Sequence, residues 1–207
     1  MAHASGRGRF VTVEGVDGAG KSTHLSWLAE RLRAAGREVV LTREPGGTPL
    51  AEKLRTLVLE QPMDPLAETL LMFAARADHV ARLIRPALGR GASVVCDRFT
   101  DATFAYQGGG KGVPVELIER LGQAAHPGLQ PDLTIVFDCP YDVSRRRLEG
   151  SGKALDRFEK EGREFHERVR SAYAARTRAE PGRMRLIDSS RPVEEIREEL
   201  EKYIPAN

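Results

Sequence analysis

The chain has 207 residues with 41% hydrophobic content, enough for one sizeable core, and a formal net charge of +2. This near balance of charges does not predict nucleic-acid binding, and no apolar stretch is long enough to predict a membrane span. We therefore expect a cytoplasmic protein with no nucleic-acid or membrane partner, in which Cys96 and Cys139 are buried reduced thiols. Residues 1–8 lack the apolar core of a signal peptide, and are expected to form a flexible extension before a single domain over 9–207.

Apolar, β-branched runs alternate with longer segments of helical periodicity along the chain. The predicted strands are 10–13, 39–42, 93–97, 133–138 and 185–187. The predicted helices are 21–35, 49–59, 64–88, 114–125, 157–179 and 192–203, with a basic helix-loop over 141–156 and a polar, glycine-rich loop over 98–112. This alternation predicts an α/β protein with a five-stranded parallel sheet and helices on both faces. Ligands of such folds bind beyond the carboxyl ends of the strands.

The stretch Phe10 to Thr23, FVTVEGVDGAGKST, matches the phosphate-binding pattern G-x-x-x-x-G-K-[ST] between a strand and a helix. Glycines let backbone amides surround an anion, and the helix N-terminus adds partial positive charge. Lys21 would reach the outer phosphates of ATP, and the Ser22 hydroxyl would ligate Mg²⁺. The alternative, a glycine-rich turn that binds nothing, fits this context poorly. The predicted ATP-binding residues are Gly15, Val16, Asp17, Gly18, Ala19, Gly20, Lys21, Ser22 and Thr23.

Two further charged pairs follow predicted strands. Asp97 ends a buried strand, as the Mg²⁺-organising aspartate of P-loop proteins does, and Arg98 follows it directly. The alternative is a plain salt bridge between these neighbours. Arg43 begins a turn with a proline and two glycines, which would present its guanidinium to the site unless it is a solvated loop charge.

The helix over 64–88 carries an apolar stripe that begins at Leu66 and Leu70. Phe73 and Arg76 share one side of it, and Phe73 taken alone is interpreted as a core residue. His79 is interpreted as a helix-surface histidine. The basic run from Arg145 into the 157–159 region would be a solvated face at Arg145, whereas its other cations could close over a triphosphate as a lid. Asp156 and Glu159 are interpreted as a capping pair or as contributors to the lid or metal site.

Six motifs occur in order from Phe10 onward: the P-loop with an acidic third position, TREPGGT (42–48), FAAR (73–76), DRF (97–99), AYQGGG (105–110) and LDRFE (155–159). Together they resemble bacterial thymidylate kinase over nearly the whole chain. The resemblance implies a P-loop kinase fold with a short mobile lid over about 145–157. It also implies transfer of the γ-phosphoryl group of ATP to dTMP, with Mg²⁺, in a homodimer.

The resemblance assigns roles residue by residue. Phe73 would stack on thymine, Arg76 would donate to a base carbonyl, and Tyr106 would exclude a ribose 2′-hydroxyl. Since the P-loop carries Asp17 where some relatives carry arginine, lid cations would meet the transferring charge. The implied dTMP-binding residues are Asp17, Arg43, Glu44, Pro45, Phe73, Arg76, Arg98, Thr103, Tyr106 and Gln107. The implied catalytic residues are Lys21, Asp17, Arg98, Arg146, Arg147 and Arg157, with Lys153 a further lid candidate, and the implied metal ligands are Ser22 and Asp97.

Two alternative functions stay open at this level. A kinase for another nucleoside monophosphate would share the P-loop but not the set of Phe73, Arg76 and Tyr106. A P-loop ATPase switch would need a residue that positions water near the γ-phosphate, and no such residue stands out in the sequence.

Overall fold

The computed structural model describes residues 7–152 and 154–204. Most of the predicted extension lies outside this range, but Gly8 lies inside it and is buried. Its amide donates to the Leu88 carbonyl at 3.1 Å, and a Cβ atom on Gly8 would lie only 1.8 Å from the Ala92 oxygen. Gly8 is therefore part of the folded body, and the expectation of a free extension through residue 8 is wrong at that position.

The sheet has five parallel strands in the order β2-β3-β1-β4-β5, which confirms the predicted fold class. The strands are β1 (Phe10–Gly15), β2 (Val39–Arg43), β3 (Ser93–Asp97), β4 (Leu133–Asp138) and β5 (Met184–Asp188). Because β1 lies between β3 and β4, with Val13 paired to Asp97, the P-loop and the segment after Asp97 emerge side by side.

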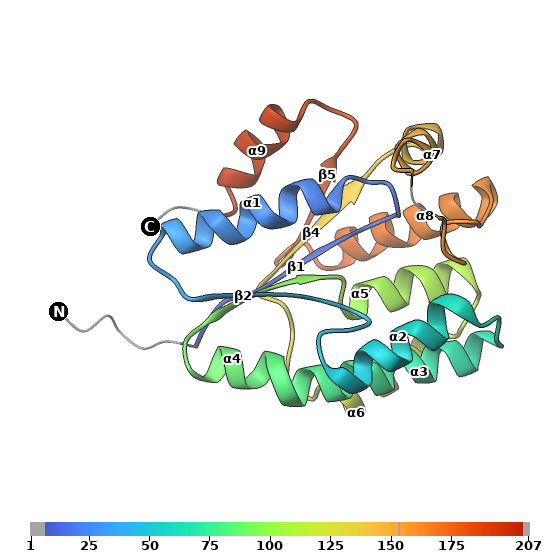
Figure 1. Ribbon diagram of the computed structural model, residues 1–207, viewed down its shortest axis with the longest axis horizontal. Coiled ribbons are helices and arrows are strands. Elements are labelled where there is room, and N and C mark those ends of the chain that lie inside the picture. Colours follow the sequence, from blue (N-terminus) through green and yellow to red (C-terminus); the bar gives the residue numbers. More distant parts are fainter. Residues whose placement is uncertain (1–6, 153, 205–207) are drawn as a thin grey trace.

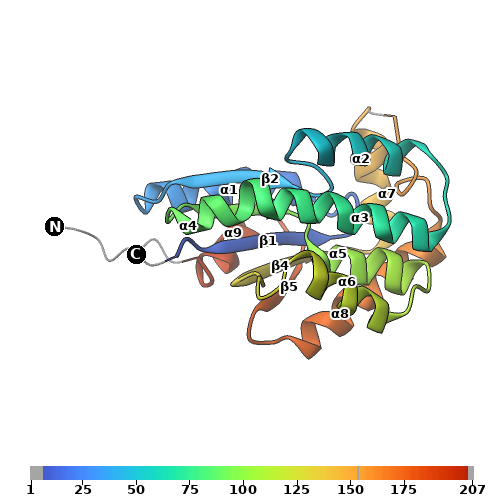
Figure 2. The same cartoon turned by 90° about the horizontal axis from the view of Figure 1, so that it is seen from below.

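Helices cover both faces of the sheet, with α1 and α9 on one side and α3 to α6 and α8 on the other (Figures 1 and 2). The helices are α1 (Lys21–Ala34), α2 (Pro49–Glu60), α3 (Pro65–His79), α4 (Arg85–Gly89), α5 (Thr100–Thr103), α6 (Val115–Ala125), α7 (Tyr141–Gly150), α8 (Arg163–Ala179) and α9 (Val193–Glu201), with π-helical segments η1 (Val80–Ile84) and η2 (Phe104–Gly110). Helices α3, η1 and α4 follow one another without a break, as the predicted helix over 64–88 requires. The π turn precedes Pro86, which has no backbone N–H to donate.

Two sequence expectations are wrong. The segment 98–112 is mostly helical, because its glycines allow close packing against α8. A Cβ on Gly109 would lie 2.5 Å from the Ala172 Cβ, and one on Gly110 would lie 2.5 Å from the Phe165 ring. Helix α8 begins at Arg163 and not at 157, because residues 156–159 form a separate capped turn.

Asp156 and Glu159 cap this turn, but they do not cap the start of the following helix as expected, because the turn is separate from α8. The Asp156 carboxylate accepts from the amides of Phe158 and Glu159 at 2.8 and 3.0 Å. The Glu159 carboxylate accepts in return from the Asp156 amide at 2.9 Å. These three bonds satisfy backbone donors in the last turn before α8.

Candidate active site

The P-loop borders a cavity at the carboxyl edge of the sheet, here called the donor cavity. Gly18 and Gly20 have φ of 73° and 82°, which residues with a Cβ adopt only with strain. Lys21 folds back on the loop, where its Nζ donates to the carbonyls of Gly15 and Val16 at 3.2 and 3.0 Å. Burial lowers the pKa of Lys21. The residues that line the donor cavity include Asp17, Gly18, Ala19, Gly20, Lys21, Ser22, Thr23, Asp97, Arg147, Ser189 and Arg191.

The two predicted metal ligands, Ser22 and Asp97, both line the donor cavity. The Asp97 Oδ1 atom is buried and has no hydrogen-bond partner among the described residues. Within that part of the chain, no group of three His, Cys, Asp or Glu side chains could hold a metal ion. A hydroxyl and one carboxylate nevertheless fit Mg²⁺, which keeps several waters and takes further oxygens from phosphates.

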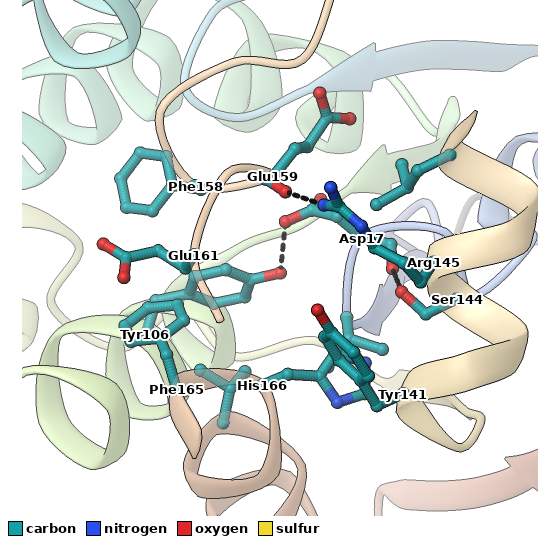
Figure 3. Close-up of a pocket in the computed structure, with 13 residues that line it drawn as sticks. Asp17, Tyr106, Tyr141, Ser144, Arg145, Phe158, Glu159, Glu161, Phe165 and His166 are labelled. Atoms are coloured by element: carbon teal, nitrogen blue, oxygen red, sulfur yellow. Dashed lines mark hydrogen bonds between the residues drawn. The ribbon is translucent and has the colours of Figure 1, made fainter. Parts of the chain in front are cut away.

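A second cavity, here called the acceptor cavity, adjoins the first. Predicted dTMP-binding residues in its wall are Asp17, Glu44, Pro45, Arg98, Tyr106 and Gln107. Asp17 lines both cavities, so a ligand on the P-loop and a ligand in the acceptor cavity would meet there. Figure 3 shows the residues around a third pocket, between α7 and α8, where Asp17 and Tyr106 again form part of the wall.

Asp17, Arg98 and Tyr106 form one hydrogen-bonded group. Arg98 Nη2 donates to Asp17 Oδ1 at 2.5 Å and to the Tyr106 hydroxyl at 3.0 Å, while the Tyr106 hydroxyl donates to Asp17 Oδ2 at 2.8 Å. Burial alone would raise the pKa of Asp17, but the charges of Arg98 and Lys21 outweigh it and lower the pKa. Arg98 has φ of 70°, an uncommon backbone state that often marks functional positions. Figure 3 shows the Tyr106–Asp17 bond.

Glu44, in the wall of the acceptor cavity, forms a buried ion pair with Arg76, whose Nε lies 2.6 Å from Glu44 Oε2. His79 shares the same carboxylate, with its Nδ1 2.9 Å from Glu44 Oε1 and its Nε2 2.8 Å from the Thr42 hydroxyl. His79 is fully buried, so its interpretation as a helix-surface histidine is wrong. The sequence did not reveal this because the Glu44 contact comes from a loop 35 residues away.

Four predicted dTMP-binding residues do not line the acceptor cavity: Arg43, Phe73, Arg76 and Thr103. The Arg43 side chain is 54% exposed and paired with Glu52. Phe73 packs in a core cluster with Phe104 and Ile118, as its helical pattern alone suggested. Thr103 is buried, where its hydroxyl accepts from Arg76 Nη1 at 3.1 Å.

Arg55 and Met72 line the acceptor cavity without having been predicted. Arg55 is held toward it by a 2.9 Å bond from Nη1 to the Pro45 carbonyl. Met72 directly precedes Phe73 on α3, and adjacent residues of a helix point to different faces. The Met72 side chain therefore lines the cavity, whereas that of Phe73 packs in the core. The sequence could have indicated Arg55, because this residue lies on the helix directly after TREPGGT, close to the turn that was predicted to face a phosphate.

The lid arginines differ in what they contact. Arg147 Nη2 donates to the Ser189 carbonyl at 2.8 Å, and its Nη1 lies 3.5 Å from the Gly18 carbonyl in the P-loop. Arg146 is exposed, and its Nε donates to the Asp142 carbonyl of its own helix at 3.2 Å. Arg157 donates to the Glu68 carboxylate and to the Val58 carbonyl, which ties its segment to α2 and α3. Lys153 lies outside the described residues.

Arg145, predicted to be solvated, is only partly so. Its Nη1 donates to the Glu159 carbonyl at 3.0 Å, and its Nε donates to Glu149 at 3.0 Å.

Both predicted buried thiols, Cys96 and Cys139, are free and buried. Among residues 7–152 and 154–204, no helix is both long and apolar enough to cross a membrane.

The sheet is parallel and has a P-loop after its central strand, and the acceptor cavity meets this P-loop at Asp17. These features define the P-loop kinase fold. Residues 13–200 match the family model described as Thymidylate kinase. The chain belongs to the thymidylate kinase family.

Several known proteins are similar to the chain. The thymidylate kinase of Bordetella petrii is 58% identical over 97% of this chain and 96% of its own length. The thymidylate kinase of Pseudomonas fluorescens is 54% identical over 96% and 95%. The crystal structure of thymidylate kinase from Ehrlichia chaffeensis aligns with a TM-score of 0.77 at 34% identity, covering 95% of this chain and 98% of that one.

Proposed function

We infer that this protein transfers the γ-phosphoryl group of ATP to dTMP, giving dTDP and ADP. The observation that carries this inference is the position of Asp17 in the walls of both the donor and the acceptor cavity. A triphosphate held by the P-loop and a second ligand in the acceptor cavity would then approach each other at this residue. Membership of the thymidylate kinase family supports dTMP as that second ligand.

The acceptor is already a phosphate anion, so the reaction needs alignment and charge neutralisation more than a strong base. Lys21, which now bonds to two loop carbonyls, would turn to the outer phosphates of ATP. Ser22 and Asp97 would hold Mg²⁺, which supplies positive charge to the β- and γ-phosphates. Arg98 and Arg55 line the acceptor cavity, where they would position the phosphate of dTMP.

Among the lid arginines, Arg147 would supply charge to the transferring group. Its guanidinium already lies at the P-loop and in the wall of the donor cavity. Arg157 would act as an anchor for the lid, because its guanidinium is held by Glu68 and Val58. Arg146 would contribute less, because its Nε donates to the Asp142 carbonyl of its own helix.

Tyr106, Gln107 and Met72 line the acceptor cavity, where Tyr106 would lie against the sugar and Gln107 and Met72 near the base. The bulk of Tyr106 would exclude a 2′-hydroxyl. Arg76, held by Glu44 behind the wall, would support the base side of the cavity.

A homodimer is supported by exposed apolar residues on α3. Leu66 and Leu70 belong to the predicted apolar stripe, yet they are 46% and 47% exposed in the single chain. A second copy that packs on this face would bury them. Sedimentation of the wild type at a dimer mass, and of Leu70→Glu at a monomer mass, would support this assembly. The free buried thiols of Cys96 and Cys139 fit a cytoplasmic location.

The direct test couples ADP release to dTMP, dUMP, dCMP, dGMP and UMP as acceptors. We expect dTMP to give the highest kcat/KM, and Lys21→Ala to abolish transfer while circular dichroism stays that of the wild type. Release of ADP without any nucleotide acceptor, at a rate above that with dTMP, would instead indicate an ATPase. A folded Lys21→Ala variant with more than about a tenth of wild-type turnover would contradict the assignment of the P-loop.

A further inference from the structure

Gln107 lies in the wall of the acceptor cavity and is itself 1% exposed. Its amide nitrogen, Nε2, donates to Glu68 Oε1 at 2.8 Å. Its amide oxygen, Oε1, is buried and has no partner among the described residues. A buried acceptor without a partner is costly, and Gln107 belongs to the cavity wall, so a donor of a bound ligand would satisfy this oxygen.

Glu68 decides which end of the Gln107 amide is left without a partner. A carboxylate oxygen only accepts hydrogen bonds, so the Gln107 end that meets Glu68 must be the NH₂ group. The other oxygen of Glu68, Oε2, accepts from Lys111 Nζ at 2.7 Å and from Arg157 Nη2. Glu68 is fully buried, and these two cations hold its carboxylate in place.

We propose that Glu68 is the specificity-determining residue that makes the acceptor cavity select a base with an N3–H donor over one with an N3 acceptor. This proposal rests on the proposed function. Glu68 touches no substrate itself and acts as a positioning residue through Gln107. Thymine and uracil carry N3–H, which would donate to Gln107 Oε1. Cytosine carries a lone pair at N3, which would face the same oxygen with two acceptors and no proton between them.

The same geometry predicts that Glu68→Gln reverses the orientation of the Gln107 amide. Lys111 and Arg157 are donors, so the oxygen of the new amide would take the Oε2 position beside them. Its NH₂ group would then take the Oε1 position and face Gln107. The Gln107 amide would have to turn its oxygen toward this NH₂ group, and its own NH₂ group would enter the cavity. A donor there suits N3 of cytosine and repels N3–H of thymine.

The experiment measures kcat/KM of the full chain with dTMP, dUMP and dCMP at saturating ATP. Glu68→Gln should lower the dTMP:dCMP ratio at least about tenfold, mainly through KM. The dTMP:dUMP ratio should stay within about twofold, because both bases carry N3–H and Glu68 does not read the 5-methyl group. An equal loss with dTMP and dCMP would overturn the proposal, because it is the result of a merely structural role.

Two further variants separate the contacts of Glu68. Lys111→Gln removes a cation from Oε2 but leaves the Oε1 contact, so the dTMP:dCMP ratio should be unchanged even if turnover falls. In a Gln107→Ala background, Glu68→Gln should have no additional effect on the ratio, since the residue acts through Gln107. An undiminished effect in that background would overturn the proposal.

If Glu68→Gln does not fold, Glu68→Asp provides the test. It keeps the charge beside Lys111 and Arg157 but shortens the reach to Gln107 by one methylene. The released amide should lower the dTMP:dCMP ratio, and an unchanged ratio in this folded variant would overturn the proposal. A wild-type protein that does not phosphorylate dTMP would instead contradict the proposed function, before any variant is measured.

Discussion

Glu44 accepts the Nε–H of Arg76 at 2.6 Å, and the two side chains are 2% and 1% exposed. The other guanidinium nitrogens of Arg76 donate to the Thr103 hydroxyl and the Phe99 carbonyl, each at 3.1 Å. Burial alone would raise the pKa of Glu44, but the charge of Arg76 outweighs it and lowers the pKa. This pair therefore connects the loop after β2 to α3 and to the segment after β3, at the wall of the acceptor cavity.

Removing one partner of this pair should be far more harmful than removing both. Glu44→Ala leaves the Arg76 charge buried without a partner, so we expect the free energy of unfolding to fall by about 3–5 kcal/mol. Glu44→Ala combined with Arg76→Met should recover much of that loss. Urea unfolding monitored by circular dichroism measures both, and a single-variant loss below about 1 kcal/mol would show that the site relaxes around the unpaired charge.

Glu14 provides a prediction about pH. It is fully buried on β1, where it accepts from the Phe99 amide and the Tyr173 hydroxyl, each at 2.7 Å. Burial, with a smaller contribution from Asp101, raises the pKa of Glu14 from 4.5 to about 8. Between these values the folded protein holds a proton that the unfolded chain releases, so this group makes stability fall as pH rises from 4.5 to 8.

Glu14→Gln imitates the protonated carboxyl and should remove this dependence. Its free energy of unfolding relative to wild type should rise with pH, by up to about 1.4 kcal/mol per pH unit, between about pH 5 and 8. Urea unfolding of both proteins at pH 5, 6.5 and 8 tests it. Parallel stability curves across that range would show that the carboxyl is ionised throughout.

Tyr106 should control the choice of sugar. Tyr106→Ala opens space beside the sugar, so discrimination against ribothymidine monophosphate should fall about tenfold or more in kcat/KM. Tyr106→Phe keeps the ring but loses the hydroxyl that bonds to Asp17 and Arg98, so it should lose turnover while it retains the sugar preference. Equal discrimination in all three proteins would exclude Tyr106 from contact with the sugar.

Arg147 and Arg146 form a natural comparison on α7. Arg147→Gln removes the charge beside the P-loop and should lower kcat by roughly 10²-fold with a smaller change in KM for ATP, because the contact is made mainly in the transition state. Arg146→Gln changes the neighbouring arginine, which bonds to the Asp142 carbonyl of its own helix, and should cost less than about tenfold in kcat. Steady-state kinetics with ATP and dTMP decide between them, and the reverse order of the two losses would contradict the assignment of Arg147.

The sequence by itself determined the features that depend on adjacent residues. Strand, glycine loop and helix follow one another over residues 10–34, so the pattern of that stretch predicts the P-loop, and the structure has it there. The five strands follow from short apolar runs, which are also local signals. The capped turn at Asp156 and Glu159 likewise depends on a spacing of three residues.

Only the tertiary structure decided which side chains meet in the cavities. The choice of Met72 over Phe73 depends on how α3 is rotated against the sheet, and one residue of rotation moves a side chain by about 100° around a helix. The glycines of 108–110 resemble a flexible loop in the sequence, yet their small size serves close packing of η2 on α8.

The contacts between residues far apart in the sequence could not be predicted either. Glu68 meets Arg157 across 89 residues of sequence and Gln107 across 39, and no local pattern connects them. A buried carboxylate with several donors forms only when packing removes water from all of them together. The helical pattern of α3 predicted a helix at Glu68. Only the tertiary structure shows that this side chain is buried and bonds to Gln107.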